Sequence, residues 1–368
     1  MILMALDHTR GFLSNAQFQP VDLDHTTPAL FLTRWITHFC APTFFLLAGV
    51  GASLSLSRGR SVPEVSRFFL TRGLWLVLLE LTVVAIGWDF TFHVAPWIAG
   101  VIWALGWSMV FMAALAWLPR AAIAGFGIAL IVLHNGADSV DPKTFGALSW
   151  IWNFLHSPDY AGTALVRIDY AVIPWVGVMA LGYAIGPWFR EPAQRRQRIL
   201  ISLGLTMIVG FLVVRLLNGY GDPLPWTVQQ RGGVYTGLSF LKVRKYPPSL
   251  DYLLMTLGPA FIALAWLEHA RGRIVSVMVT YGRVPLLFYV LHIYLAHLIA
   301  LVVAYTEHGT FSFLITTDGP AAHHPPWFGL NLGWVYVAWL LIVIALYPAC
   351  RAFAAIKARR RDWWLSYL

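Results

Sequence analysis

The sequence predicts an all-α protein, a polytopic bundle of transmembrane helices. Of its 368 residues, 58% are hydrophobic and only 12% are charged, with a mean hydropathy of +0.66. A soluble domain carries about 25% charged residues. The apolar residues form continuous runs, many near the roughly 20 residues that a helix needs to cross a bilayer, and they do not alternate as in a membrane β-barrel. These features exclude a soluble domain, a nucleic-acid-binding protein and a disordered chain.

Nine apolar runs are expected to be full spans within a single domain that covers residues 1–368. In chain order they are Ala29–Ser57, Phe68–Gly87, Pro96–Leu118, Ala121–His134, Tyr170–Trp188, Ile199–Leu217, Ser249–Leu267, Val284–Tyr305 and Phe328–Cys350. A further run, Met1–Leu6, is only about 9 Å long as a helix, against about 30 Å for a bilayer core. We therefore expect about ten spans, with the first one truncated and the natural start upstream.

Basic residues set the expected orientation of these spans. They gather in alternate connections and in the C-terminal tail, and the first such connection with its helix ends holds Arg58, Arg60, Arg67 and Arg72. Most acidic residues lie in the other connections. By the positive-inside rule, the arginine-rich connections and the C-terminus are cytoplasmic. The run Met1–Leu6 then exits outward, which predicts that Asp7 and His8 lie at the outer face.

Two histidines at the outer face are candidate general bases. Asp7 precedes His8, and Asp24 precedes His25. A neutral imidazole at an apolar–aqueous boundary accepts a proton near neutral pH, and a nearby carboxylate can orient it. Adjacent residues on a helix face different ways, so the alternative of two unrelated Asp–His pairs stays open.

Ionisable residues inside the spans are the second group of candidates. Arg34 and His38 lie four residues apart on one helix face, and Glu80 and His292 lie deep in later spans. Such groups are costly in a bilayer, so they face a polar cavity and partner one another. They are expected either to bind substrate or to form a structural ion pair of the Arg34–Glu80 type.

Neither a metal site nor a disulfide framework is expected. Histidines are numerous at the outer face, but no Asp or Cys partners follow them at the spacing of metal ligands. Cys40 and Cys350 lie at or in apolar segments and suit small buried hydrophobic residues.

Four sequence blocks carry a family resemblance. They are "MALDHTRGF…DLDHTTPALFLTRWITHFCAPTFFLLAGVGASLSL", "VRIDYAVIPWVGVMALGYAIG", "KYPPSLDYLLMTLGPA" and "YGRVPLLFYVLHIYLAHL". With these blocks the chain resembles bacterial membrane proteins that are similar to the catalytic region of heparan-α-glucosaminide N-acetyltransferase, within the transmembrane acyltransferase superfamily.

The resemblance implies an acetyl (acyl) transfer across the membrane, here the bacterial cytoplasmic membrane. Acetyl-CoA is the cytosolic donor, and the acceptor is an amino or hydroxyl group of a sugar or cell-envelope glycan. The catalytic histidine of the family precedes a helix that corresponds to "FCAPTFFLLAG", which points to His25. A polar residue that closes the first span corresponds to His8. Arg58, Arg60 and Arg72 are candidates to bind the phosphate groups of CoA. Alternatively, they only fix the topology of the spans.

Direct transfer with His25 or His8 as the base is the expected mechanism, with an acyl-histidine intermediate as its variant. Asp7 or Asp24 would orient the base, and Arg34 is one candidate donor to the developing oxyanion. The expected partners are the bilayer, acyl-CoA and the glycan, with a homodimer left open. A transporter or permease for a small polar solute, with Arg34, Glu80 and His292 along its path, is the rival from another class.

Overall fold

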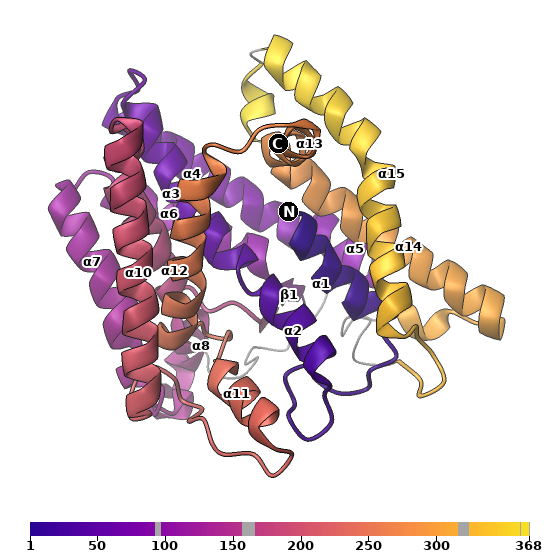
Figure 1. Cartoon of the computed structure of the whole chain (residues 1–368). Helices are drawn as coiled ribbons and strands as arrows, with labels where there is room; N and C mark the ends of the chain where they lie inside the picture. Colours follow the sequence, from indigo (N-terminus) through magenta and orange to yellow (C-terminus); the bar gives the residue numbers. More distant parts are fainter. Residues whose placement is uncertain (93–96, 157–165, 316–323, 361, 368) are drawn as a thin grey trace. The chain divides into compact units, whose positions relative to one another are not determined.

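The computed structural model describes residues 1–92, 97–156, 166–315, 324–360 and 362–367. Apart from one pair of short strands, the regular structure in these ranges is helical (Figure 1). Within them, seven helical segments are long and apolar enough to cross a membrane. This confirms the predicted all-α membrane class. The chain forms two compact units: unit 1 comprises Met1–Cys40, Thr82–Trp97 and Ala270–Leu368, and unit 2 comprises Ala41–Leu81 and Ile98–His269.

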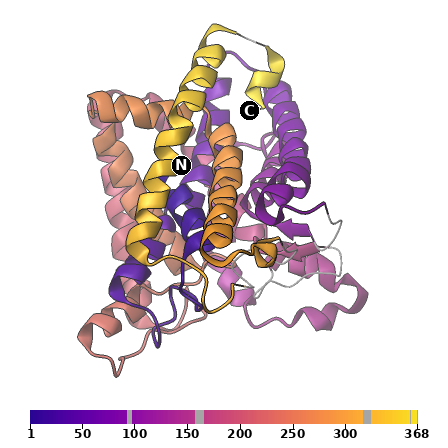
Figure 2. The ribbon, with the colours of Figure 1, turned by 90° about the vertical axis from the view of Figure 1, so that its right-hand side faces the viewer.

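Unit 1 is built around its N-terminal helix. Its helices are α1 (Ile2–Leu13), α2 (Pro28–Thr37), α5 (Ala85–Asp89), α13 (Arg273–Arg283), α14 (Pro285–His308), η5 (Ser312–Leu314), α15 (Leu332–Arg359) and η7 (Trp363–Ser366). Helix α1 packs against α2, α14 and α15, and α14 and α15 lie side by side (Figure 2). Phe12 and Leu13 are fully buried at the end of α1, so this helix forms the core of the unit.

Unit 2 is a set of paired helices. They are α3 (Cys40–Leu56), α4 (Val62–Leu79), α6 (Val101–Leu115), α7 (Arg120–Leu133), η2 (His134–Ala137), η3 (Pro142–Leu148), α8 (Ser149–His156), α9 (Ile173–Ile185), η4 (Gly186–Arg190), α10 (Ala193–Leu217), α11 (Gly233–Leu241) and α12 (Leu250–Leu267). The strands β1 (Trp97–Ala99) and β2 (Val166–Ile168) pair with each other. A π-helical turn, η1 (Glu80–Val84), carries the chain from unit 2 into unit 1.

Each of the nine expected spans overlaps at least one helix, but seven segments of the described residues are long enough to cross a membrane, and the other two expected spans contain helices shorter than the apolar run. Helix α6 has 15 residues and α9 has 13. In the first case residues 97–99 form a strand, and the start of the expected span, Pro96, lies outside the described residues. In the second case Pro187 cannot continue an α-helix, because it lacks an N–H and its ring clashes with the preceding turn. A tighter helix, η4, replaces the last turn.

Two local features differ from the expectation near the N-terminus. The expected span Ala29–Ser57 is broken at His38 and Phe39, since the ring of Pro42 clashes with the carbonyl four residues earlier. The expected short run Met1–Leu6 is longer, because α1 continues to Leu13. Asp7 and His8 therefore lie in the middle of a helix and not at its end.

Paired glycines let the helices of unit 2 approach closely. A Cβ on Gly106 of α6 would lie 2.6 Å from the carbonyl oxygen of Gly73 on α4, and the reciprocal distance is also 2.6 Å. Gly204 and Gly258 make the same kind of contact between α10 and α12, which run side by side (Figure 1). In lipid the hydrophobic effect does not drive helices together. Small residues at such crossings let the backbones pack closely, and this van der Waals contact stabilises the pair.

A buried arginine ties the loop after α10 to that helix. Arg215 is 1% exposed, and its guanidinium donates to four backbone carbonyls, those of Leu224, Ser239, Phe240 and Lys242, at 2.6–3.1 Å. The carboxylate of Asp251 lies 3.6 Å away. This arginine therefore orders the connection from α10 to α12 and is satisfied by the protein itself.

We expect Gly106→Ala to destabilise the protein by about 1–3 kcal/mol, since the added methyl group overpacks a backbone contact. Gly125→Ala on α7 is the matched control, because nothing lies within 4 Å of the position that its added Cβ would take. Thermal unfolding of the purified protein in detergent measures both. Equal melting temperatures for the two variants would contradict the close packing of α4 on α6.

Candidate functional site

Two histidines from distant parts of the sequence form the centre of the candidate site in unit 1. Nδ1 of His8 on α1 lies 2.7 Å from Nε2 of His292 on α14. The two rings are stacked, with centroids 4.9 Å apart and an angle of 12° between their planes. His292 is fully buried, and His8 is partly exposed. The structure therefore joins one predicted catalytic residue directly to one predicted binding residue.

The backbone fixes which nitrogens carry protons in this pair. Nδ1 of His292 lies 2.8 Å from the carbonyl oxygen of Phe288, one turn earlier on α14. A carbonyl only accepts, so Nδ1 of His292 donates, and Nε2 of the neutral ring is then an acceptor. Nδ1 of His8 must donate to it. In neutral His8 the remaining nitrogen, Nε2, is left as the proton acceptor.

Aromatic side chains hold the His8 ring in place. Trp88 on α5 meets it edge to face with centroids 4.8 Å apart, and Tyr289 does so at 6.0 Å. Phe12, one turn after His8 on α1, stacks on the same Trp88 at 5.1 Å. These contacts limit rotation of the imidazole, which keeps its hydrogen bond to His292 aligned.

Asp7 belongs to a separate cluster with two arginines. It accepts a hydrogen bond from Arg10 at 3.1 Å and another from Arg34 on α2. The side chains of Asp7 and Arg34 are only 14% and 13% exposed. Successive helix residues are rotated by about 100°, so Asp7 turns to α2 while His8 turns to α14. The three groups together carry one more positive than negative charge.

The second predicted base, His25, has a different carboxylate partner from the one expected. Its Nδ1 lies 2.8 Å from Oδ2 of Asp22, and its side chain is 66% exposed. The other oxygen of Asp22 accepts from the backbone N–H of Asp24, which is itself exposed. Asp22 and His25 meet because the chain turns between them, with the backbone N–H groups of His25 and Thr26 donating to the Asp22 carbonyl. The carboxylate that orients His25 is therefore Asp22.

His38 is buried at the break between α2 and α3, 4% exposed, four residues after Arg34.

A further histidine of α14 is structural: the ring nitrogens of His297 each lie 3.1 Å from a backbone carbonyl, those of Gly87 and Leu314. This histidine ties α14 to α5 and to η5.

Glu80 in unit 2 caps a helix. It is 2% exposed, and its carboxyl group lies against the backbone at the start of α6, with Oε1 beside Gly100, while Oε2 has no hydrogen-bond partner among the described residues. A carboxylate at a helix N-terminus is stabilised by the unpaired N–H groups and the helix dipole. The sequence suggested an ion pair between Glu80 and Arg34. In the structure Glu80 instead lies against the start of α6, and the carboxylate that binds Arg34 is that of Asp7.

Of the predicted phosphate-binding arginines of unit 2, Arg58 and Arg60 lie in the connection between α3 and α4, and Arg72 lies on α4. Arg58 and Arg60 are exposed there. The guanidinium groups of Arg60 and Arg72 lie 5.5 Å and 5.7 Å from the ring centroid of Phe68. An exposed, basic connection of this kind can hold phosphate groups.

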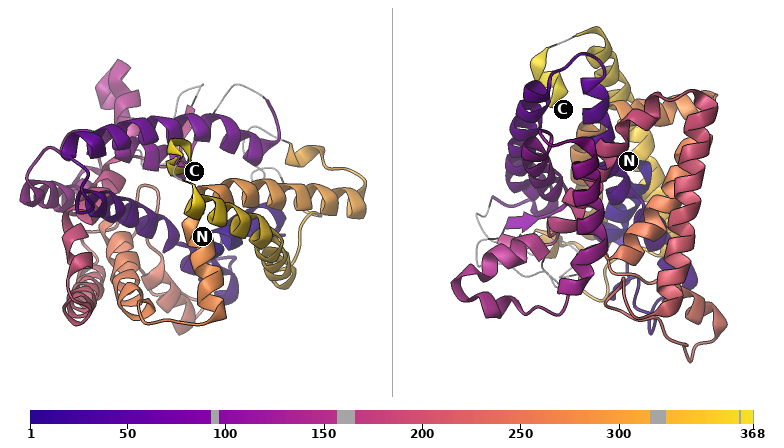
Figure 3. Two further views of the ribbon diagram at one scale, coloured as in Figure 1. Left: turned by 90° about the horizontal axis from the view of Figure 1, so that it is seen from above. Right: turned by 90° about the vertical axis from the view of Figure 1, so that its left-hand side faces the viewer.

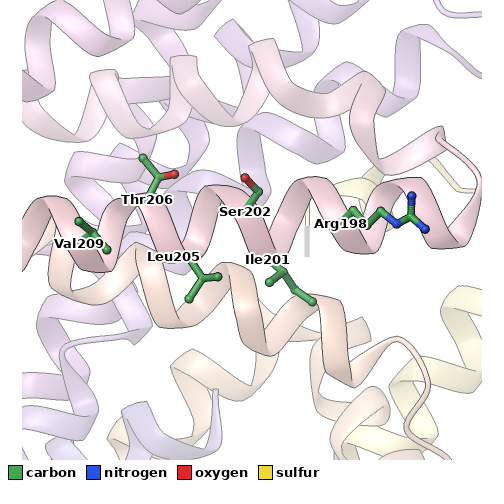
Figure 4. A pocket seen from close by; sticks show the side chains of 6 residues that line it. All are labelled: Arg198, Ile201, Ser202, Leu205, Thr206 and Val209. Carbon is green, nitrogen blue, oxygen red and sulfur yellow. The ribbon is translucent and has the colours of Figure 1, made fainter.

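A shallow hollow of about 540 Å³ lies along one face of α10 (Figure 4). Its lining comes from this helix alone: Arg198, Ile201, Ser202, Leu205, Thr206 and Val209. It holds neither a base nor a nucleophile with a base beside it, so it does not compete with the histidine pair as a reaction site. Among the described residues, no group of three or more His, Cys, Asp or Glu side chains is placed to hold a metal ion.

Sequence reasoning missed three residues of the site. Asp22 precedes His25 by three residues, a spacing typical of a turn, and this signal could have found it. Trp88 and Tyr289 meet His8 from distant segments, and no local pattern marks them.

The end of α1 is clasped by the segment before α15. Leu330 exchanges backbone hydrogen bonds with Leu13 and Asn15 at 2.6 Å and 3.0 Å. In the same segment the ring of His324 packs 5.0 Å from that of Phe328. Burial lowers the pKa of His324 to about 4, and a hydrogen bond to the Ser14 backbone offsets part of this effect.

Comparison with known proteins gives one family. Residues 1–216, more than half of the chain, match the family described as heparan-alpha-glucosaminide N-acetyltransferase, catalytic. No curated protein matches the chain.

The burial of His324 in the segment before α15 predicts that the stability of the folded protein falls in acid. An unfolded histidine binds its proton near pH 6.5, so between about pH 6.5 and 4 the unfolded state binds more protons at His324 than the folded state. Stability therefore falls as the pH falls through this window. In thermal unfolding from pH 7.5 to 4.5, His324→Gln should lose less stability than the unaltered protein. Parallel pH profiles would show that His324 is not the sensitive group.

Proposed function

The chain belongs to the heparan-α-glucosaminide N-acetyltransferase catalytic family, and we propose that it transfers an acetyl group from acetyl-CoA to a sugar. The acceptor is an amino or hydroxyl group of a glycan at the outer face of a bacterial cytoplasmic membrane. The His8–His292 pair carries this proposal, because it supplies a general base whose accepting nitrogen is fixed by the fold.

The reaction needs one base and one acid, and His8 serves as both. Nε2 of His8 takes the proton of the acceptor as the acceptor nitrogen or oxygen attacks the thioester carbonyl carbon. The new bond to the acetyl group forms and the C–S bond breaks. The leaving thiolate then takes the proton from the His8 imidazolium, which returns the histidine to its neutral form.

His292 stabilises His8 in both of its states. The Nδ1–H of His8 donates to Nε2 of His292 before and after proton uptake, so the pair need not rearrange during the reaction. The N–H of His292 is in turn held by the Phe288 carbonyl. This arrangement resembles the way a carboxylate orients a catalytic histidine, with a neutral ring in place of the carboxylate.

The two arginines that bind Asp7, the residue before His8, suit the charge that develops in the transfer. Attack on the thioester places negative charge on the carbonyl oxygen, and positively charged donors in a water-poor site stabilise it. Arg34 and Arg10 both donate to the carboxylate of Asp7, which holds their positive charges next to the helix that carries His8. We assign Arg34 to this role.

His25 is the alternative base. Its ring is oriented by Asp22, but it is largely exposed, where water competes for its proton. This exposure favours a role in receiving the acceptor sugar over the transfer step itself.

Replacing His8 tests the assignment of the base. In purified protein reconstituted with acetyl-CoA and glucosamine, His8→Gln should lower the rate of CoA thiol release roughly 100-fold or more. In His292→Gln the glutamine oxygen still accepts the hydrogen bond from Nδ1–H of His8, so the rate of thiol release should fall less than roughly tenfold. In His292→Phe no acceptor is left, and the rate should fall considerably more.

The matched control is His25→Gln. Unchanged turnover in His8→Gln together with a collapse in His25→Gln would transfer the role of base to His25. Unchanged turnover in both variants would remove the histidine mechanism. Solute uptake without any thiol release, in protein that folds normally, would favour a transporter.

The donor site has its own prediction. The double variant Arg58→Gln, Arg60→Gln should raise the KM for acetyl-CoA several-fold, on the order of 1 kcal/mol, with kcat little changed, because it removes phosphate contacts and not the base. Arg195→Gln is the control, since Arg195 is 72% exposed in the first turn of α10, at a different place in unit 2. Equal KM values in the two variants would limit Arg58 and Arg60 to setting the topology.

A further inference from the structure

Helix α13 differs in direction from the spans that follow it. Figure 1 draws α13 nearly end-on, whereas α14 and α15 run along the page, and in the left panel of Figure 3 α13 and α14 again run crosswise. The corner lies at Val284, before Pro285 starts α14. With 11 residues, α13 is about 16 Å long, too short to cross a bilayer.

The side chains of α13 are sharply divided between two faces. At about 100° per residue, Arg273, Ser276, Thr280 and Arg283 share a polar face. Ile274, Met278 and Val279 lie on the broad apolar face, together with Val275, Val277 and Tyr281. Such a division is typical of a helix that lies at the boundary between water and lipid.

The protein covers only one edge of this apolar face. Tyr281 is 1% exposed, and its hydroxyl donates to the Val343 carbonyl of α15 at 2.5 Å. By contrast, Ile274 is 74% exposed, Met278 53% and Val279 45%. One edge therefore anchors α13 to unit 1, and the rest of the face is left for another apolar environment.

We propose that α13 lies in the headgroup region of the leaflet on the arginine-rich side of the membrane and binds anionic phospholipid. Its exposed apolar side chains reach the acyl chains, while Arg273 and Arg283, at the two ends of the polar face, bind the lipid phosphates. The charges favour this occupant over a second copy of the chain, because arginines at both ends of the helix match an anionic surface and would have to be paired in a protein interface.

The corner at Val284 explains why the helix would stay in this plane. The fixed backbone angle of Pro285 starts α14 immediately after α13, and Tyr281 is anchored to α15. A helix held crosswise at the start of α14 would lie at one depth in the membrane along its whole length.

Depth measurements on single labels test the proposal. Cys40 and Cys350 are replaced by alanine, and a fluorophore is attached at Ile274→Cys or Met278→Cys, with Ser276→Cys and Thr280→Cys as the matched polar-face sites. The protein is placed in nanodiscs of phosphatidylcholine alone or mixed with phosphatidylglycerol. We expect a nitroxide on the lipid acyl chain to quench the first pair about threefold more than aqueous iodide does, and the reverse for the second pair.

Two results would overturn the placement. Quenching of the Ile274 and Met278 labels mainly by iodide would put the face in water, and protection from both quenchers would mean that protein, such as a second copy, covers it. Recognition of anionic lipid is tested separately. Phosphatidylglycerol should increase the quenching of the Ile274→Cys label by lipid nitroxide, and the double variant Arg273→Gln, Arg283→Gln should lose this increase. No response to phosphatidylglycerol in the unaltered sequence would refute recognition of anionic lipid.

Discussion

A hydrogen bond between two histidines that lie 284 positions apart in the sequence holds helix α1 against α14. The other contacts of α1 depend on the same placement. With the His8 ring turned to α14, Asp7 is directed to Arg34 on α2, and Phe12 meets Trp88 one turn later. Helix α1 can bring a base and a positive cluster together in this way because it forms the core of its unit and is not a peripheral span.

The polar groups buried in the apolar segments fall into two classes. Some lie against backbone groups: Glu80 against the start of α6, Arg215 with four carbonyls as acceptors, and His297 between two carbonyls, to one of which its single N–H donates. A buried polar group needs such partners in lipid, and these residues stabilise the fold. The His8–His292 pair is different because one imidazole satisfies another, so that the pair can take up a proton and release it without breaking a contact to the backbone.

The composition and the length of the apolar runs were sufficient to predict the helical membrane class and the approximate position of each long helix. The helix break before Pro42 could also have been predicted from the sequence, since the clash of a proline with the preceding turn is local. The His8–His292 bond was not, because no periodicity relates residues on the first and last parts of a chain. The choice of Asp22 over Asp24 depended on the path of a turn, which adjacency in sequence does not specify.

The protonation state of His8 is the most direct test of the account. Solid-state NMR of the reconstituted protein with ¹⁵N-labelled histidine, assigned by comparison with His8→Gln, reports which ring nitrogen carries the proton. At neutral pH we predict a proton on Nδ1 of His8 and none on Nε2, and we predict that this preference is lost in His292→Phe. A proton on Nε2 of neutral His8, in the unaltered protein, would contradict the assignment of that nitrogen as the base.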